Sequence, residues 1–281
     1  MTSTEIKNKV IRFGHTPEPD DAYMFFGLAK GVVKIDDYKI EHILEDIESL
    51  NQKAIHANID VTAISTAVYP QIAHLYWILP TGASVGRNYG PVVVKKKGIQ
   101  PKTKKIGVPG LNTTAYLLFR LYFSGYEAVP YQFDLIPSAL EKGEIDFGIL
   151  IHEAQLTYEK LGFEKIADLG VLWMEDTHLP IPLGLDVVRK DLGKELCLKI
   201  WKGLKESIIA ANEDRANSIP YALQYGRGLE TKLGEKFVGM YVNEDTLDMG
   251  EEGEKAINIL FEKAFKAGIF NQIVKAELLK T

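Results

Sequence analysis

Hydroxyl groups and free backbone amides come together in a loop that joins an apolar strand to a helix. A glycine turn precedes the first helical residues in the segment Val108-Pro109-Gly110-Leu111-Asn112-Thr113-Thr114-Ala115. Amides at the start of a helix have no partner within the helix, and the helix dipole favours an anion there. Thr113 and Thr114 can add hydroxyl donors, so the loop is suited to a carboxylate. A role of Asn112 or Thr113 as a simple helix cap explains the same residues equally well.

The same loop is unlike the loops that bind nucleotide cofactors. It lacks the Gly-Lys-Ser/Thr ending of a phosphate-binding loop and the glycine spacing of a dinucleotide site. His15 and Glu18 have no metal-ligand spacing with another histidine or cysteine. The single cysteine, Cys197, lies in an apolar helical pattern. We therefore expect no cofactor, no metal, and a buried, unreactive thiol.

A histidine follows a second apolar strand, predicted over residues 145–151. His152 is placed where the side chain emerges at the carboxyl end of a sheet, with Glu153 beside it. In open α/β sheets this edge faces the ligand crevice. An imidazole that titrates near neutral pH can act there as a general base. The alternative is that His152 only caps the next helix.

The end of the first predicted strand, over residues 10–15, supplies further polar groups. Asp20 and Asp21 begin a helix, where carboxylates commonly stabilise the dipole. We interpret Asp20 as structural and leave Asp21 as either a dipole partner or a ligand contact. Ser65 ends another predicted strand and can donate a hydroxyl to a ligand. Asn51 lies within a predicted helix, and its position alone indicates no function.

Composition and charge exclude several classes of protein. Among the 281 residues, 33 are Lys or Arg and 38 are Asp or Glu, and these charges are interspersed, so nucleic acid is not an expected partner. No apolar run approaches the roughly 18 residues of a membrane-spanning helix. The first nine residues are polar and do not resemble a secretory signal, so we expect a cytoplasmic protein. No Gly-x-Ser-x-Gly motif or nucleophile–base pair favours a serine or cysteine hydrolase.

Short strands alternate with helices, which predicts an α/β protein of two lobes. The basic, punctuated run at 95–102 indicates a lobe boundary, so we assign residues 1–97 to the first lobe and 98–190 to the second. Residues 191–281 read as helical and include an apolar stripe that ends at Gly268. We expect this helical tail to pack on the first lobe.

Several motifs, taken together, resemble dihydroxynaphthoate synthases of the futalosine route to menaquinone. They occur in order along nearly the whole chain: Glu45-Asp46-Ile47-Glu48-Ser49-Leu50-Asn51, Gly86-Arg87-Asn88-Tyr89-Gly90-Pro91, the loop from Val108 to Tyr116, Ile149-Leu150-Ile151-His152-Glu153, Leu179-Pro180-Ile181-Pro182-Leu183-Gly184 and Tyr241-Val242-Asn243. The threonine loop and the Ile-His-Glu segment are the most specific of these.

The resemblance implies a type II periplasmic-binding-protein-like fold, in which each lobe is a mixed, mainly parallel sheet flanked by helices. It also implies a lyase that converts cyclic dehypoxanthinyl futalosine, a small carboxylated substrate, to 1,4-dihydroxy-6-naphthoate without a cofactor. The family's catalytic base falls on His152, and its ligand contacts fall on Asn51, Ser65, Thr114 and Ala115. We add Thr113, Asp21 and, from the shared glycine-rich motif, Arg87 as candidate substrate-binding residues. The sequence is also compatible with a homodimer.

One motif departs from the family pattern. Where the family usually shows Ser-Pro-Cys-Pro-Asn-Asp, this chain has Thr16-Pro17-Glu18-Pro19-Asp20-Asp21. The added acid beside the cleft leaves open a related enzyme with a different carboxylated substrate. A solute-binding protein that closes on a small organic anion without reaction is the alternative from another class.

Overall fold

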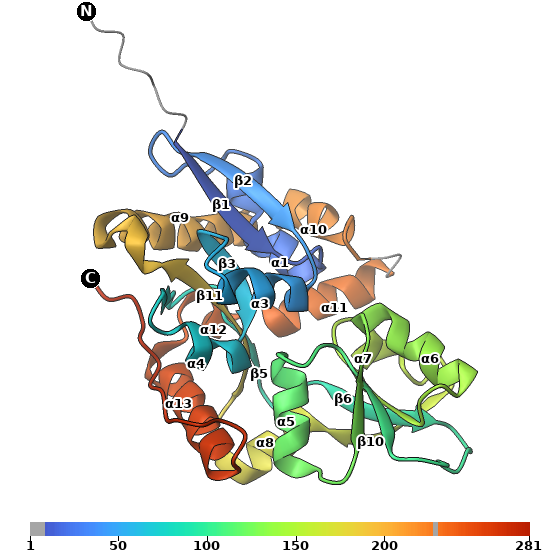
Figure 1. Ribbon diagram of the computed structural model, residues 1–281. Helices are drawn as coiled ribbons and strands as arrows, with labels where there is room; N and C mark the ends of the chain where they lie inside the picture. Colours follow the sequence, from blue (N-terminus) through green and yellow to red (C-terminus); the bar gives the residue numbers. More distant parts are fainter. Residues whose placement is uncertain (1–8, 227–229) are drawn as a thin grey trace, which may run out of the picture.

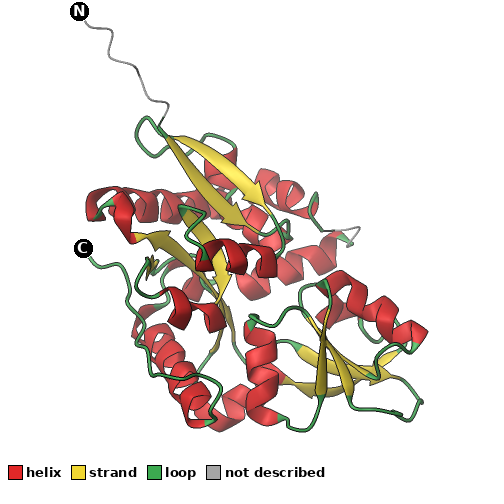
Figure 2. Cartoon of the chain, in the orientation of Figure 1, coloured by secondary structure: helices red, strands yellow, loops and turns green. Residues whose placement is uncertain are grey.

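The computed structural model describes residues 9–226 and 230–281, which form two α/β lobes side by side (Figure 1). The polar segment 1–8, in which we expect no secretory signal, lies outside the described residues. Each lobe contains one sheet with helices packed against it, as the colouring by secondary structure shows (Figure 2). Among the described residues, no helix is long and apolar enough to cross a membrane.

The first lobe is built on a sheet with the strand order β2-β1-β3-β11-β4, and β5 also pairs with β11. Its strands are β1 (Val10–His15), β2 (Lys39–Leu44), β3 (Val61–Ser65), β4 (Tyr76–Ile78), β5 (Ser84–Gly86) and β11 (Ile181–Arg189). Strands β2, β1 and β3 are parallel, whereas β11 runs antiparallel to β3, β4 and β5. The carboxyl ends of β1 and β3 therefore meet at one edge of the sheet.

The second lobe has a sheet with the strand order β10-β6-β9-β7-β8. Its strands are β6 (Val92–Lys96), β7 (Lys105–Val108), β8 (Glu127–Pro130), β9 (Phe147–Leu150) and β10 (Phe163–Asp168). Strands β8, β7 and β9 are parallel, and β6 and β10 add antiparallel pairs. This mixed pattern brings the carboxyl ends of β7 and β9 to the same edge.

Short helices connect the strands of both lobes. In the first lobe they are α1 (Pro19–Met24), α2 (Phe26–Ala29), α3 (Ile47–Ile55), η1 (Thr66–Val68) and α4 (Tyr69–Ile72). In the second they are α5 (Thr114–Tyr122), η2 (Phe133–Leu135), α6 (Ile136–Lys142), α7 (Ala154–Thr157) and α8 (Leu169–Thr177). Asp46 caps α3, because its carboxylate accepts hydrogen bonds from the amides of Glu48 and Ser49.

The lobe boundaries that we predicted at 97/98 and 190/191 do not match the structure. Two strands, β6 and β11, belong to the sheet of the other lobe than the one to which we assigned them. Strand β6 pairs with β9 and β10 in the second sheet, so the chain crosses between lobes at 87–91, before the basic run. Strand β11 belongs to the first sheet, so the return crossing lies in 169–180. The basic run resembled a linker because it forms an exposed turn after β6, whose valines are buried against the second sheet. We did not predict β10 and α8.

The last third of the chain is helical, as expected, and packs mainly on the first lobe. Its helices are η3 (Lys190–Leu192), α9 (Lys194–Glu213), α10 (Arg215–Leu223), α11 (Thr231–Tyr241), α12 (Glu244–Leu247) and α13 (Gly250–Lys266). Cys197 is buried in the core between α9 and β1, and burial raises the pKa of its thiol to about 11. Helix α13 also contacts α5 of the second lobe, so the tail braces both lobes.

Candidate active site

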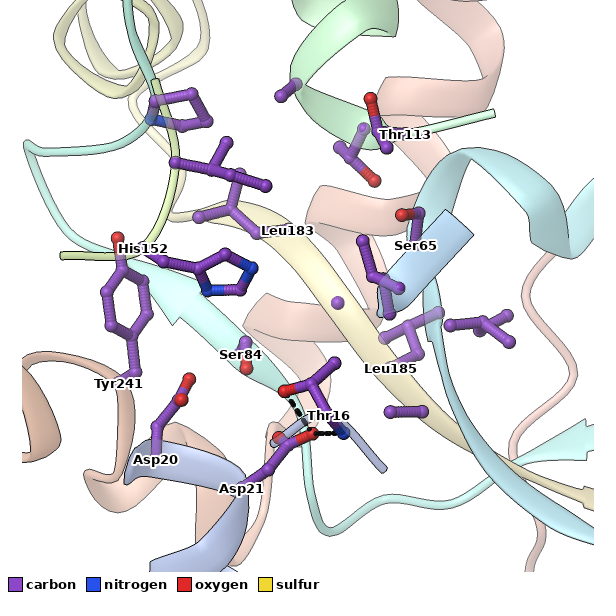
Figure 3. Close-up of a pocket in the computed structure, with 18 of the residues that line it drawn as sticks. Thr16, Asp20, Asp21, Ser65, Ser84, Thr113, His152, Leu183, Leu185 and Tyr241 are labelled. Carbon is purple, nitrogen blue, oxygen red and sulfur yellow. Dashed lines mark hydrogen bonds between the residues drawn. The ribbon is translucent and has the colours of Figure 1, made fainter. Parts of the chain in front are cut away.

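A pocket lies between the lobes, where the ends of strands from both sheets face each other (Figure 3). It encloses about 760 Å³ of non-atom space, part of it open to solvent. Of the residues we predicted from the sequence, six line it: Asp21, Ser65, Thr113, Thr114, Ala115 and His152.

The amino end of α5 forms one wall of the pocket. Thr113 is the helix cap, because its hydroxyl oxygen accepts from the amide of Tyr116 at 3.3 Å while its O–H donates to the carbonyl of Gly110 at 2.9 Å. The hydroxyl of Thr113 is therefore occupied, and the wall offers a ligand the first amides of α5 instead. The Thr114 hydroxyl oxygen accepts from the amide of Ala67 in the first lobe at 3.1 Å, which leaves its O–H to donate.

Asn51 does not line the pocket but positions Ser65, which does. The side-chain carbonyl of Asn51 accepts from the Ser65 amide at 2.8 Å, and its NH₂ group donates to the Ser65 hydroxyl oxygen at 3.1 Å. Both residues are buried, at 0% and 3% exposure. Because the Ser65 oxygen already accepts from Asn51, its hydrogen is left to donate toward a ligand. The position of Asn51 within a helix did not indicate this role, because the pairing depends on how α3 packs against the end of β3.

His152 is the second residue after β9 and has a backbone φ of 53°. This left-handed conformation is uncommon for residues other than glycine and is enriched at functional sites. Its ring packs against the edge of Phe133 at 4.7 Å between centroids and points into the pocket (Figure 3). The predicted strand-end position therefore places an imidazole opposite the first lobe and on the same lobe as α5.

Two pocket residues that we did not predict join the lobes near His152. Gln155, on α7, donates a hydrogen bond from its side-chain NH₂ group to the hydroxyl of Tyr241 on α11 at 2.6 Å. Both side chains are buried, and burial raises the pKa of Tyr241. Tyr241 belongs to the Tyr-Val-Asn motif, and Gln155 follows the Ile-His-Glu segment. These positions were the only indication of a role in the sequence.

The opposite wall of the pocket is acidic. Asp20 and Asp21 both line it, so Asp20, which we interpreted from the sequence as structural, is also placed to contact a ligand. The Asp21 carboxylate accepts from the amide of Thr16 at 2.5 Å and from its hydroxyl at 2.8 Å. Burial raises the pKa of Asp21 to about 6, against the opposing effect of Thr16. Burial and the neighbouring Asp21 raise the pKa of Asp20 to about 8.

Arg87, a predicted substrate-binding residue, does not line the pocket. Its guanidinium group donates two hydrogen bonds to the carboxylate of Asp245, at 2.7 and 2.8 Å, and another to Glu252 at 2.7 Å. The side chain is 48% exposed. Arg87 follows β5, where the chain crosses to the second lobe, and it joins this crossing to α12 and α13 rather than to a ligand.

Asn112 joins the lobes outside the pocket. Its side-chain NH₂ group donates to the carboxylate of Glu48 on α3 at 2.5 Å, and its backbone amide donates to the same carboxylate at 3.2 Å. Gly110 lies against this carboxylate with φ of +126°, so no side chain fits there. The role of Asn112 is therefore contact between lobes, and Thr113 is the cap. No group of three or more His, Cys, Asp or Glu side chains suited to a metal occurs in 9–226 or 230–281.

Comparison with known proteins identifies the family. Residues 11–266 match a family model described as menaquinone biosynthesis. The chain is 35% identical over 262 residues to a 1,4-dihydroxy-6-naphthoate synthase of Thermus thermophilus, covering 93% of this chain and 96% of that one. It is 33% identical over 266 residues to the synthase of Streptomyces coelicolor, covering 92% and 94% of the two chains.

Solved structures share the fold. A crystal structure of an Archaeoglobus fulgidus protein superposes with a TM-score of 0.89 at 43% identity, covering 93% of this chain and 98% of that chain. A Candida albicans protein described as having the generic periplasmic binding protein fold superposes with a TM-score of 0.71 at 12% identity, covering 97% and 98% of the two chains. The two-lobed periplasmic-binding-protein-like fold expected from the sequence is therefore confirmed.

Proposed function

Because the chain belongs to the menaquinone biosynthesis family, we propose that it is a cofactor-free lyase that converts cyclic dehypoxanthinyl futalosine to 1,4-dihydroxy-6-naphthoate, with His152 as general base. The observation that carries the proposal is the placement of two groups in one pocket. His152 and the amino end of α5 both line the cavity between the lobes. Because the base and the anion-binding helix end belong to the same lobe, the distance between them does not depend on the position of the other lobe.

In the proposed complex the substrate carboxylate lies against the first amides of α5, where the helix dipole favours it. The hydroxyl groups of Thr114 and Ser65 donate to the substrate, and Asn51 holds Ser65 in place. Apolar side chains between the two ends, including Leu183 and Leu185, contact the flat part of the molecule. The imidazole of His152 then takes the proton whose removal starts ring opening.

The test is to incubate the purified protein with the cyclic futalosine derivative and to look for the naphthoate by mass spectrometry. We expect product from the wild type and none above background from His152→Asn. Calorimetry on the variant should still detect binding of the substrate, because the carboxylate contacts at α5 are unchanged.

Binding without product in the wild type would contradict the lyase and favour the solute-binding alternative. No binding at all would favour a related enzyme with a different carboxylated substrate. Mass spectrometry reports the product and calorimetry reports binding, so the two measurements together separate these outcomes.

A further inference from the structure

The two ends of the pocket have opposite electrostatic character. The amino end of α5 offers hydrogen-bond donors, whereas Asp20 and Asp21 lie together on the first-lobe wall (Figure 3). The described residues that line the pocket include no lysine or arginine. Two adjacent carboxylates without a nearby cation cannot both be ionised in a buried site at moderate pH without a large cost. One of the two must hold its proton.

The surroundings of the two carboxyl groups favour Asp20 as the neutral one, although the backbone amides of Asp20 and Asp21 partly oppose the rise in its pKa. Asp21 is held as an anion, because its carboxylate accepts two hydrogen bonds from Thr16. Asp20 is 6% exposed, and its Oδ1 atom has no hydrogen-bond partner among the described residues. A buried polar atom without a partner is costly and points to a missing ligand. In Figure 3 the carboxyl group of Asp20 is directed into the pocket, toward the side on which His152 and Tyr241 lie.

We propose that Asp20 binds the substrate as a neutral carboxylic acid and donates a hydrogen bond to one of its oxygen atoms. The inference rests on the proposed function for the identity of the substrate. In this arrangement the end of the substrate that is remote from its carboxylate lies against the first-lobe wall. That end carries hydroxyl and ether oxygens. A protonated carboxyl group offers one donor and one acceptor, which suits such oxygens and rejects a second anion.

The groups that face Asp20 from neighbouring elements support a neutral state. Asp21 lies on the same helix, and Glu153, in the loop after β9, adds negative charge from the second lobe. Tyr241 on α11 remains neutral because burial raises its pKa. Arg215 on α10 donates instead to the hydroxyl of Tyr23 on α1, a residue that does not line the pocket. The pKa of Asp20, raised to about 8 by burial and Asp21, agrees with this arrangement.

The main test compares the pH dependence of kcat/KM for the wild type and Asp20→Asn. The amide keeps the shape of the side chain and donates at every pH. In the wild type kcat/KM should fall about tenfold per pH unit above pH 8, because ionised Asp20 no longer donates. The variant should lose this alkaline decline, because its amide has no proton to give up in this pH range. A variant with the wild-type decline would overturn the proposal.

Asp186→Asn is the matched control. Asp186, on β11, is buried, also has an oxygen without a hydrogen-bond partner, and is influenced by Asp21, but it does not line the pocket. The control should retain the wild-type pH profile. If Asp186→Asn removes the alkaline decline instead, the assignment to Asp20 is wrong.

A measurement without substrate separates this inference from the proposed function. In protein labelled with ¹³C at aspartate carboxyl groups, the NMR signal missing from Asp20→Asn should titrate near pH 8. A signal that titrates near pH 4 would overturn the neutral acid even if the protein makes the naphthoate. A protein that makes no naphthoate contradicts the proposed function, and the titration near pH 8 would still support a neutral Asp20.

Discussion

His15 and His152 occupy similar places in the two lobes, one at the end of β1 and the other two residues after the end of β9. Only His152 lines the pocket. The His15 ring is 3% exposed, stacks on Phe25 at 4.3 Å between centroids, and its Nε2 lies 3.0 Å from Nδ1 of His42. Burial lowers the pKa of His15 to about 3, so this ring is neutral and unsuited to taking up a proton.

The difference shows that a strand end alone does not make a functional residue. His15 still belongs to β1, and its ring packs within the first lobe. His152 has left its strand, and its left-handed backbone turns the ring into the cleft. The same contrast holds at the ends of β3 and β5, since Ser65 lines the pocket and Arg87 does not. Substitutions at these four strand ends test the comparison.

The largest expected effect is at the end of β9. We predict that His152→Asn lowers kcat by about 10²–10⁴-fold, the range for loss of a general base. Asparagine tolerates the left-handed backbone, so the unfolding midpoint should change little. Stopped assays for the naphthoate, with thermal unfolding monitored in parallel, measure both. Turnover within threefold of the wild type would remove His152 from the chemistry.

Ser65, at the end of β3, is held in place by Asn51 on α3. The substitution Asn51→Ala removes both hydrogen bonds to Ser65. We predict a loss of about tenfold in kcat/KM, because one ligand donor is no longer oriented, and a loss of ~1–3 kcal/mol in unfolding free energy, because the buried Ser65 amide is unpaired. Denaturant titration and steady-state kinetics measure the two effects. Gln52→Ala is the control and should change neither, because Gln52 is an exposed neighbour on α3 whose side chain donates to Glu48.

At the end of β1, His15→Phe should alter stability and leave the chemistry unchanged. Because the pKa of His15 is lowered in the folded protein, the unfolded chain takes up a proton first as the pH falls below about 6.5. The wild type therefore loses stability as the pH falls from 6.5 toward 3, and the variant should lose less. Unfolding free energies across this range measure the effect. A fall in neutral-pH turnover comparable to that of His152→Asn would contradict the comparison.

The smallest expected effect is at the end of β5. Arg87→Ala removes the ion pairs of a half-exposed guanidinium group with Asp245 and Glu252, which together are worth about 0.5–1 kcal/mol in the unfolding free energy. Turnover and substrate affinity should remain at the wild-type level. A loss of affinity without a loss of stability would restore Arg87 to the list of substrate contacts.

Periodicity and turn residues predicted most of the elements near the site. The expected strand at 10–15 coincides with β1, and α5 begins at Thr114, within the segment in which we expected a helix to start. These segments have uniform patterns and clear end residues. Strand β10 and helix α8 were not predicted. For β10 the reason is that charged side chains interrupt the apolar pattern, because it is an edge strand whose outer face is exposed.

The pocket residues were predicted where a strand end or a helix start marks them, as for Ser65 and Thr114. Contacts that depend on tertiary placement could not be predicted in this way. Nothing local distinguishes Asp20 from any carboxylate that stabilises a helix dipole. Likewise, the pairing of Gln155 with Tyr241 joins residues 86 positions apart. The sequence predicts which edge of each sheet carries the site, and packing of the lobes decides which side chains reach it.

The backbone conformation of His152 has a consequence for how this fold diversifies. A residue with φ of 53° is replaced at low cost by asparagine, aspartate or glycine, and at high cost by a β-branched residue. The proposed base could thus be lost in descent while the lobes and the anion-binding helix end remain intact. On this scaffold, a single tolerated substitution would separate a catalyst from a receptor for the same molecule.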